Sequence, residues 1–120
     1  MIYTSYYSNR NLKKIDGSLR LVGISQGIPK WYHGEVFKKL APTWAMVKMT
    51  NEDDYTALYK SQILSGLDPI EIAKLLDNSI LLCWEKPGDF CHRRLVAKWL
   101  EEATGQEVPE WGEDTNKICF

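Results

Sequence analysis

The sequence predicts an α/β fold, built as a single three-layer domain with a four- or five-stranded, largely parallel sheet and helices on both faces. Short runs of β-forming residues alternate along the chain with segments whose apolar residues recur every three or four positions. Residues 80–84 form a continuous apolar run between turn signals, which is typical of a parallel strand buried on both faces. The chain has 120 residues, 44% of them hydrophobic, which is enough for one hydrophobic core. We therefore expect the domain to span residues 1–111, followed by a polar C-terminal tail at residues 112–120.

Besides the apolar run, the sequence predicts three further strands and a short edge strand. Residues 2–7 and 19–25 are rich in β-forming residues, and residues 43–49 alternate weakly between apolar and polar. The link between the first two strands is too short for a standard crossover helix, which needs roughly a dozen residues. Residues 108–111 would form the edge strand, with Pro109 limiting its pairing.

Helix start and stop signals place the helices between these strands. Asn51 is a cap signal, and the pair Asp68-Pro69 is a second, stronger one. Asp89 is the expected cap of the last helix, and Gly105 is the expected residue beyond its end. Helices are therefore expected at residues 35–40, 52–64, 69–76 and between Asp89 and Gly105.

The charge balance and the cysteine count disfavour several classes of protein. The 15 basic and 16 acidic residues give a net charge of −1, so a nucleic-acid partner stays open but is not favoured. No apolar run approaches the roughly 18 residues that a membrane helix needs, and the first residues do not form a secretion signal. Three cysteines, an odd number without framework spacing, indicate a reduced, cytoplasmic protein. The sequence carries no signal for an oligomeric state.

Reactive residue types concentrate where the last long strand leads into the last helix. Cys83 and Glu85 follow the strand, and the cap Asp89 would put Cys91 and His92 in the first helical turn. Backbone amides at a helix start are unpaired and carry a partial positive charge, so an anion is well received there. The same field favours the thiolate of Cys91 as a nucleophile. Glu85 or His92 would act as acid or base, and Cys83 would line the ligand's crevice.

Arg93 lies just beyond this first turn. The guanidinium of Arg93, or that of the neighbouring Arg94, would add a two-pronged contact to a phosphate or carboxylate group. Together with the helix start, it makes this corner a candidate anion-binding site.

Each of these residues also has a purely structural interpretation. Cys83 could be a small core residue, Cys91 could pack under the helix, and His92 could only bond a backbone carbonyl. Zinc is a further alternative, because Cys83, Cys91 and His92 are three donor side chains close in sequence. Their spacing is not that of a standard zinc knuckle, and adjacent Cys91 and His92 rarely bind one ion together. We therefore expect no metal and no cofactor.

Ligands of parallel sheets bind beyond the carboxyl ends of the strands. We expect three segments to converge there, at residues 6–11, 25–33 and 83–94. Aromatic residues in them would stack on a flat ligand such as a base, or would belong to the core. The candidate ligand contacts outside the cysteine segment are Tyr6, Asn9, Arg10 and Trp31.

Residues 83–94, which we call the cysteine corner, resemble the signature of an uncharacterised family, domain of unknown function 488. That signature is a strand, then Cys-x-Glu, a short proline-containing loop, and Cys-His-Arg opening a helix; here Cys83-Trp84-Glu85 and Cys91-His92-Arg93 match it. The start of the chain, Ile2-Tyr3-Thr4 followed by Ser8-Asn9-Arg10, is also similar. The resemblance implies an α/β fold and a site at Cys83, Glu85, Cys91, His92 and Arg93, and it implies no established reaction.

The second strand departs from the family's pattern. Members carry Asp-Val-Arg there, followed by a proline and Ser-Arg, whereas this chain has Gly23-Ile24-Ser25 and then Pro29-Lys30-Trp31. The acid and the arginine are absent, so any role they serve in the family is in doubt here. From this departure we expect the chain to belong to a divergent, phage-like branch of the family.

Two functional hypotheses follow from the sequence. The first is a small enzyme that binds or acts on a phosphate-bearing small molecule, such as a nucleotide or a nucleic-acid component, at the cysteine corner. The alternative is a non-catalytic module that senses nucleotides or binds another protein. The sequence leaves open whether the chain is an enzyme.

Overall fold

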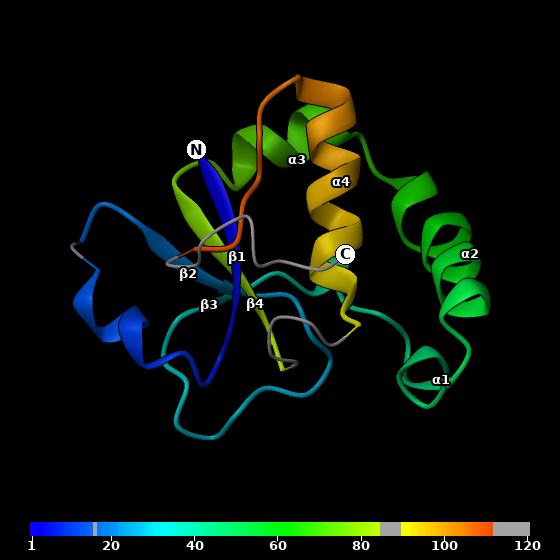
Figure 1. Ribbon diagram of the computed structural model, residues 1–120, viewed down its shortest axis with the longest axis horizontal. Coiled ribbons are helices and arrows are strands. Elements are labelled where there is room, and N and C mark those ends of the chain that lie inside the picture. Colours follow the sequence, from blue (N-terminus) through cyan, green and yellow to red (C-terminus); the bar gives the residue numbers. More distant parts are fainter. Residues whose placement is uncertain (16, 85–89, 112–120) are drawn as a thin grey trace.

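The computed structural model describes residues 1–15, 17–84 and 90–111. Within them, four parallel strands form one sheet in the order β1-β4-β2-β3 (Figure 1). The strands are β1 (Ile2–Tyr6), β2 (Arg20–Gly23), β3 (Glu35–Val36) and β4 (Ser79–Cys83). The predicted α/β fold with a four-stranded parallel sheet is confirmed.

Strand β4 lies in the middle of the sheet, and all five of its residues are buried. Its alternate side chains enter two different cores, since successive residues of a strand point to opposite faces. Leu81 packs with Val22 on one face, and Ile80 and Leu82 pack with Tyr7 on the other. Burial on both faces explains why this strand is a continuous apolar run.

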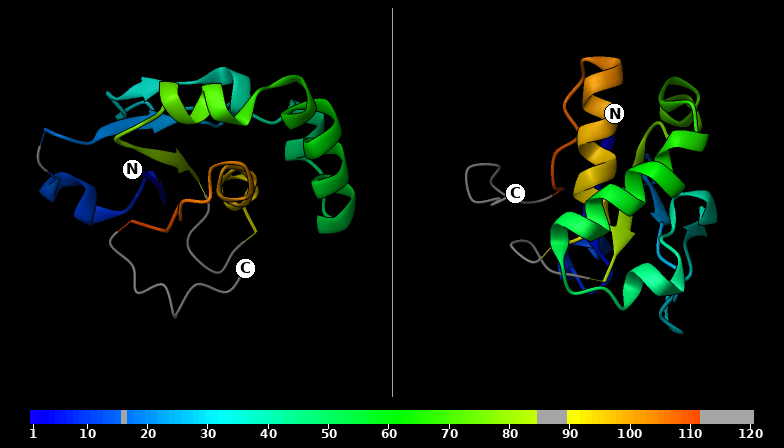
Figure 2. Two further views of the ribbon diagram at one scale, coloured as in Figure 1. Left: turned by 90° about the horizontal axis from the view of Figure 1, so that it is seen from above. Right: turned by 90° about the vertical axis from the view of Figure 1, so that its right-hand side faces the viewer.

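The two faces of the sheet are covered in different ways (Figure 2). The helices α2 (Glu52–Gln62), α3 (Pro69–Leu75) and α4 (His92–Thr104) lie on one face. The opposite face is covered by the 3₁₀-helix η1 (Arg10–Lys14) and by irregular segments. The predicted helical cover on both faces is therefore present, but the short link between β1 and β2 supplies only a 3₁₀-helix.

The predicted caps hold the ends of these helices. The side chain of Asn51 accepts a hydrogen bond from the backbone amide of Asp54 at 3.0 Å, and Asp68 accepts one from Ile70 at 2.9 Å. Gly105 ends α4 with a φ of 73°, a conformation that costs glycine little. The cap and stop signals of α2, α3 and α4 are confirmed at these three positions.

Two predicted elements are wrong. Residues 43–49 do not form a strand: they contain the short helix α1 (Trp44–Val47), whose first turn is capped by the Thr43 hydroxyl. Residues 35–40 do not form one helix, because β3 pairs with β2 and only Lys38–Leu40 turn into the 3₁₀-helix η2. At residues 43–49 the cap at Thr43 outweighs the weak alternation of apolar and polar residues. At residues 35–40 the pairing of β3 with β2 outweighs the helical spacing of the apolar residues.

The segment at residues 108–111 runs along the free edge of β1. The amide of Thr4 donates to the carbonyl of Pro109 at 3.0 Å, and the amide of Trp111 donates to the carbonyl of Thr4 at 2.8 Å. It forms an isolated bridge between Thr4 and Glu110 in place of the predicted edge strand. The tail expected at residues 112–120 lies outside the described residues, so the domain limit stays a prediction.

Among the described residues, none of the helices has the length and apolar character to cross a membrane.

Truncation of the central strand tests the double-sided core. We expect Leu81→Ala to lower the free energy of unfolding by about 2–5 kcal/mol, because it leaves a cavity against Val22. Leu75 is 59% exposed, so Leu75→Ala should change it by less than about 0.5 kcal/mol. Urea unfolding of both variants measures the difference, and equal losses would contradict the assignment.

Candidate functional site

The three loops predicted to converge do meet at the carboxyl ends of β1, β2 and β4. The amide of Tyr7 donates to the carbonyl of Cys83 at 3.0 Å, which joins the first loop to the last strand. The hydroxyls of Tyr7 and Ser25 share a hydrogen bond of 2.6 Å. The indole nitrogen of Trp84 donates to the carbonyl of Gly27 at 2.8 Å. Hydrogen bonds therefore link all three loops around one place.

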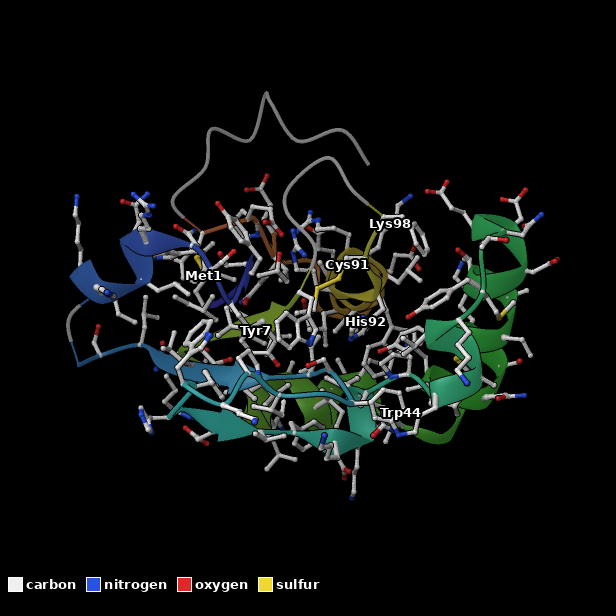
Figure 3. The ribbon with its side chains drawn as sticks, turned by 90° about the horizontal axis from the view of Figure 1, so that it is seen from below. Met1, Tyr7, Trp44, Cys91, His92 and Lys98 are labelled. Atoms are coloured by element: carbon white, nitrogen blue, oxygen red, sulfur yellow. A yellow bond between two sulfur atoms is a disulfide. The ribbon has the colours of Figure 1, made fainter. Side chains whose placement is uncertain are left out.

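A pocket of about 210 Å³ opens beside these contacts, and Cys83, Cys91 and His92 form its reactive lining. Figure 3 looks at this edge of the molecule and shows His92 between Tyr7 and Trp44. Trp44 and Trp84 are 59% and 52% exposed. The aromatic residues that line the pocket are Trp44, Tyr55, Trp84 and Phe90. The pocket thus combines flat apolar walls with sulfur and imidazole groups.

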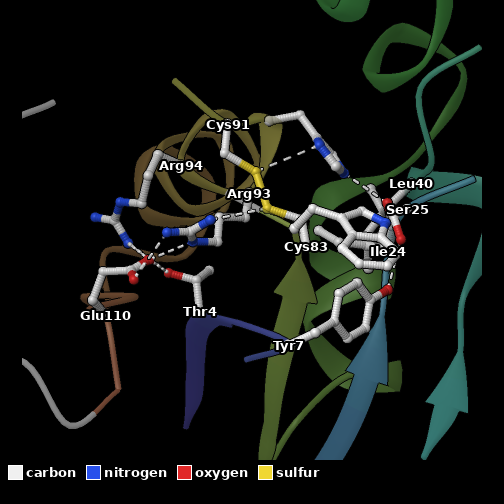
Figure 4. Close-up of a disulfide and its surroundings, with 12 residues drawn as sticks. Thr4, Tyr7, Ile24, Ser25, Leu40, Cys83, Cys91, Arg93, Arg94 and Glu110 are labelled. Atoms are coloured by element: carbon white, nitrogen blue, oxygen red, sulfur yellow. Dashed lines mark hydrogen bonds and ion pairs between the residues drawn. A yellow bond between two sulfur atoms is a disulfide. The ribbon is translucent and has the colours of Figure 1, made fainter. Parts of the chain in front are cut away.

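Cys83 and Cys91 are joined by a disulfide in this structure (Figure 4). Cys83 ends β4 and Cys91 directly precedes α4, so the bond ties the strand to the helix. Both residues are buried. The sequence predicted reduced cysteines, because their separation matches no disulfide framework; the fold brings the two sulfur atoms together instead.

His92 is buried and turned so that its two ring nitrogens have different partners. Nε2 lies 2.6 Å from the carbonyl oxygen of Ile24, so Nε2 carries the proton and donates it. Nδ1 lies 3.8 Å from Sγ of Cys91 and is left with a free lone pair. Burial lowers the pKa of His92 to about 4, opposed by the bond to Ile24 and assisted by the charge of Arg93. The imidazole is therefore neutral at neutral pH.

Arg93 lies entirely inside the protein, next to the disulfide. Its Nε and Nη2 donate to the two carboxylate oxygens of Glu110 at 2.8 and 3.3 Å. Its Nη1 donates to Sγ of Cys83 at 3.0 Å. The two-pronged partner that the sequence suggested for Arg93 is therefore, in this structure, a carboxylate of the protein itself (Figure 4).

Arg94 completes this polar cluster. Its Nη1 donates to the hydroxyl of Thr4 at 2.9 Å and to the carbonyl of Val108 at 2.8 Å. Thr4 in turn donates to Glu110 at 2.5 Å. The start of α4 is thereby fastened to β1 and to the segment that follows the helix.

Helix α4 begins later than the sequence predicted. Its first residue is His92 and Cys91 occupies the cap position, without a hydrogen bond from its side chain to the helix. The expectation that Cys91 lies within the first turn is therefore wrong by a small margin. The expected cap, Asp89, and the expected acid or base, Glu85, lie outside the described residues.

The other predicted ligand contacts do not line the pocket. Asn9 is buried, and its side chain caps η1 by accepting from the amide of Asn11 at 3.0 Å. Tyr6, Arg10 and Trp31 are absent from the pocket's lining as well. Their binding roles stay predictions.

Several residues of the site were not predicted. Trp44 was assigned to a strand, although Thr43 after Pro42 is a usable cap signal. Tyr55 was assigned to the core face of a helix, and it does pack there while also lining the pocket. Glu110 carried no local signal, because its partner Arg93 is distant in sequence.

The buried pair of Arg93 and Glu110 should dominate the electrostatic stability of the fold. We expect Glu110→Gln to lower the free energy of unfolding by about 3–5 kcal/mol, because it leaves a buried guanidinium without its counter-charge. The exposed pair of Arg20 and Glu35 has a similar N–O distance of 2.8 Å, yet Glu35→Gln should cost less than about 1 kcal/mol. Urea unfolding at neutral pH compares the two, and a small loss for Glu110→Gln would refute the prediction.

The neutral state of His92 makes stability depend on pH. Its pKa is about 4 in the folded protein and near 6.5 when unfolded, so the unfolded chain takes up the proton first as pH falls. Stability should therefore decline between pH 6.5 and pH 4, by roughly 3 kcal/mol from this group. His92→Gln keeps a hydrogen-bond donor for the carbonyl of Ile24, and its stability should fall less steeply with pH because the titrating imidazole is gone. His33→Gln, at an exposed position, should show the same fall in stability as the wild type. Chemical unfolding at a series of pH values, with a chelator present, gives the two slopes; identical slopes would count against a buried neutral His92.

Comparison with known proteins supports the sequence resemblance. No match was found among curated proteins, and none among solved structures. The family model described as the active DUF488-N3 subclade matches residues 2–104, a range that includes Cys83, Cys91, His92 and Arg93 but stops before Glu110. This match covers most of the chain, and the chain therefore belongs to the DUF488-N3a family.

Proposed function

We propose that the chain is an enzyme that acts on a nucleotide or a nucleic-acid component, with the base held in the aromatic pocket. The observation that carries this proposal is the lining of one pocket by Trp44, Trp84 and the group Cys83, Cys91 and His92. Aromatic side chains stack on the faces of bases at about 1–3 kcal/mol each. The description of the DUF488-N3 subclade as active supports an enzyme.

The size of the pocket supports a ligand that is only partly enclosed. Its volume of about 210 Å³ is below the roughly 300–1,000 Å³ of pockets that surround a whole drug-sized ligand. A flat base would enter, and the sugar and phosphate would remain near the opening. Ser25 and Gln26 also line the pocket and provide polar atoms for the edge of a base.

The start of α4 supports an anionic group on the ligand. Cys91 and His92 lie both at this helix start and in the pocket's lining. The partial positive charge at a helix start attracts anions, which supports the anion contact predicted at this place. Because the guanidinium of Arg93 is held by Glu110 and Cys83, we assign the anion to the helix end and assign Arg93 to holding Cys83 in place.

The reacting groups would come from Cys83, Cys91 and His92 after reduction of the disulfide. Nδ1 of His92 faces Cys91 with a free lone pair, so it can accept a proton there. Arg93 donates to Cys83 and favours its thiolate form. Glu85 remains a predicted acid or base.

A pocket variant and an exposed control variant test the binding site. We expect reduced protein to bind a nucleoside monophosphate and to be stabilised by about 2.7 kcal/mol at 100 times the dissociation constant. Trp44→Ala should weaken binding by about 5- to 150-fold, the equivalent of one lost stacking contact. Leu75 is 59% exposed and lies outside the pocket, so Leu75→Ala should leave binding unchanged.

Thermal unfolding with a panel of nucleotides and nucleosides measures binding, and product analysis measures turnover. Unchanged binding in Trp44→Ala, or equal losses in Trp44→Ala and Leu75→Ala, would refute the pocket. Cys91→Ala should abolish turnover and keep binding. Binding by the wild type without any turnover would favour the non-catalytic sensing module.

A further inference from the structure

We propose that reduced Cys83, Cys91 and His92 bind one zinc ion whose fourth position is open to the pocket. The two sulfur atoms and a ring nitrogen of His92 all lie within 4.8 Å of one another. A tetrahedral ion with Zn–S bonds of about 2.3 Å and Zn–N bonds of about 2.0 Å places such atoms about 3.5–3.8 Å apart. The three side chains are therefore close enough to surround one ion once reduction lets the two sulfur atoms separate.

The orientation of His92 fits a metal ligand. Histidines that bind metal usually donate their other ring N–H to a carboxylate or a backbone carbonyl, which fixes the ring. Nε2 of His92 donates to the carbonyl of Ile24 at 2.6 Å. Nδ1 points at Cys91, 3.8 Å from its sulfur, which is close to the separation expected for two ligands of one zinc ion.

The backbone separation of the two cysteines also fits. Their Cα atoms are 7.3 Å apart, whereas disulfides usually join Cα atoms about 4.4–6.8 Å apart. Two thiolates on one zinc ion keep their sulfur atoms about 3.8 Å apart, so they suit a wider backbone spacing. Strand β4 and helix α4 thus hold Cys83 and Cys91 at a distance suited to a shared ion.

Arg93 supplies the support that a thiolate ligand needs from its surroundings. Its Nη1 donates to Sγ of Cys83 at 3.0 Å, while Glu110 fixes the rest of the guanidinium. A donor in this position favours the deprotonated sulfur and restrains its direction.

Zinc binding requires the disulfide to be reduced first. A phosphine does this by giving two electrons to the S–S bond and becoming a phosphine oxide, with the oxygen and two protons coming from water. Zinc then displaces the two thiol protons and accepts the lone pair of Nδ1.

Three protein ligands leave one position for water, and zinc lowers the pKa of bound water to about 7. The open position would face the pocket that Cys83, Cys91 and His92 line. The geometry then points to hydrolytic chemistry on the bound ligand. That last step rests on the proposed function, whereas the metal site itself does not.

Cobalt reports on this site directly. We expect reduced, metal-free full-length chain to bind one Co²⁺ and to show thiolate-to-cobalt charge-transfer bands with the visible bands of tetrahedral cobalt. Zinc should displace the cobalt, and added cyanide should shift the visible bands by taking the open position. The same chain with its disulfide intact should show none of these bands, which controls for folding without any substitution.

Ligand variants and matched controls complete the test. Loss of a residue that only hydrogen-bonds to a metal ligand weakens metal binding by about 10- to 100-fold. We expect a larger loss of zinc affinity in each of the ligand variants Cys83→Ser, Cys91→Ser and His92→Ala. The chain has three cysteines and two histidines, so Cys119→Ser and His33→Ala are the remaining candidates and should not change it. Absence of charge-transfer bands in reduced wild type, or their dependence on Cys119 or His33, would overturn the proposal.

The metal site and the proposed function can fail separately. Cobalt binding without any nucleotide binding would keep the zinc site and reject the ligand. Nucleotide binding and turnover by a protein that shows no charge-transfer bands would reject the zinc site and leave the sulfur groups as the reacting groups.

Discussion

The buried guanidinium of Arg93 is the constraint on which the rest of this structure depends. Taking a charge out of water costs several kcal/mol, and the cost is offset only where hydrogen bonds and an opposite charge surround it. Glu110 provides a two-pronged carboxylate, and Cys83 provides a sulfur acceptor. Because Glu110 must reach this place, the segment after α4 has to run along the edge of β1, where it pairs with Thr4. One ion pair therefore fixes the sheet edge, the helix start and the wall of the site together.

The same constraint makes the candidate site rigid where its chemistry lies. Cys83 ends the central strand, Cys91 and His92 open α4, and the carbonyl of Ile24 after β2 holds the imidazole. Each group is thus positioned by a regular element or by a hydrogen bond to one. Sites held this way keep their geometry to within fractions of an ångström, which catalysis and metal binding both require. The aromatic walls, in contrast, come from α1, α2 and the loop beside β4, so they can vary without disturbing the sulfur and imidazole groups.

The parts of the fold that sequence reasoning could reach are those that depend on neighbours along the chain. The apolar run of β4, the caps Asn51 and Asp68, and the stop at Gly105 each encode their structure within a few residues, and all were predictable. The convergence of three loops followed from the rule for parallel sheets. Glu110 and the disulfide were not predictable, because they depend on which segments meet after folding. The weak alternation of residues 43–49 predicts a strand at Trp44, whereas in the structure the cap at Thr43 starts a helix there.

The charges around the buried site bear on the form that its two cysteines take. Arg93 pairs with Glu110, Arg94 lies 3.9 Å from the same carboxylate, and His92 is neutral, so the cluster without the cysteines holds one positive charge in excess. The disulfide has no charge. Two thiolates without a cation would place two negative charges in a region from which water is excluded, which is costly. In the proposed zinc-bound state, the ion with two thiolates would again be neutral as a unit, and its open position would face the pocket. Reduction and metal supply would then decide between the disulfide state and the proposed zinc-bound state.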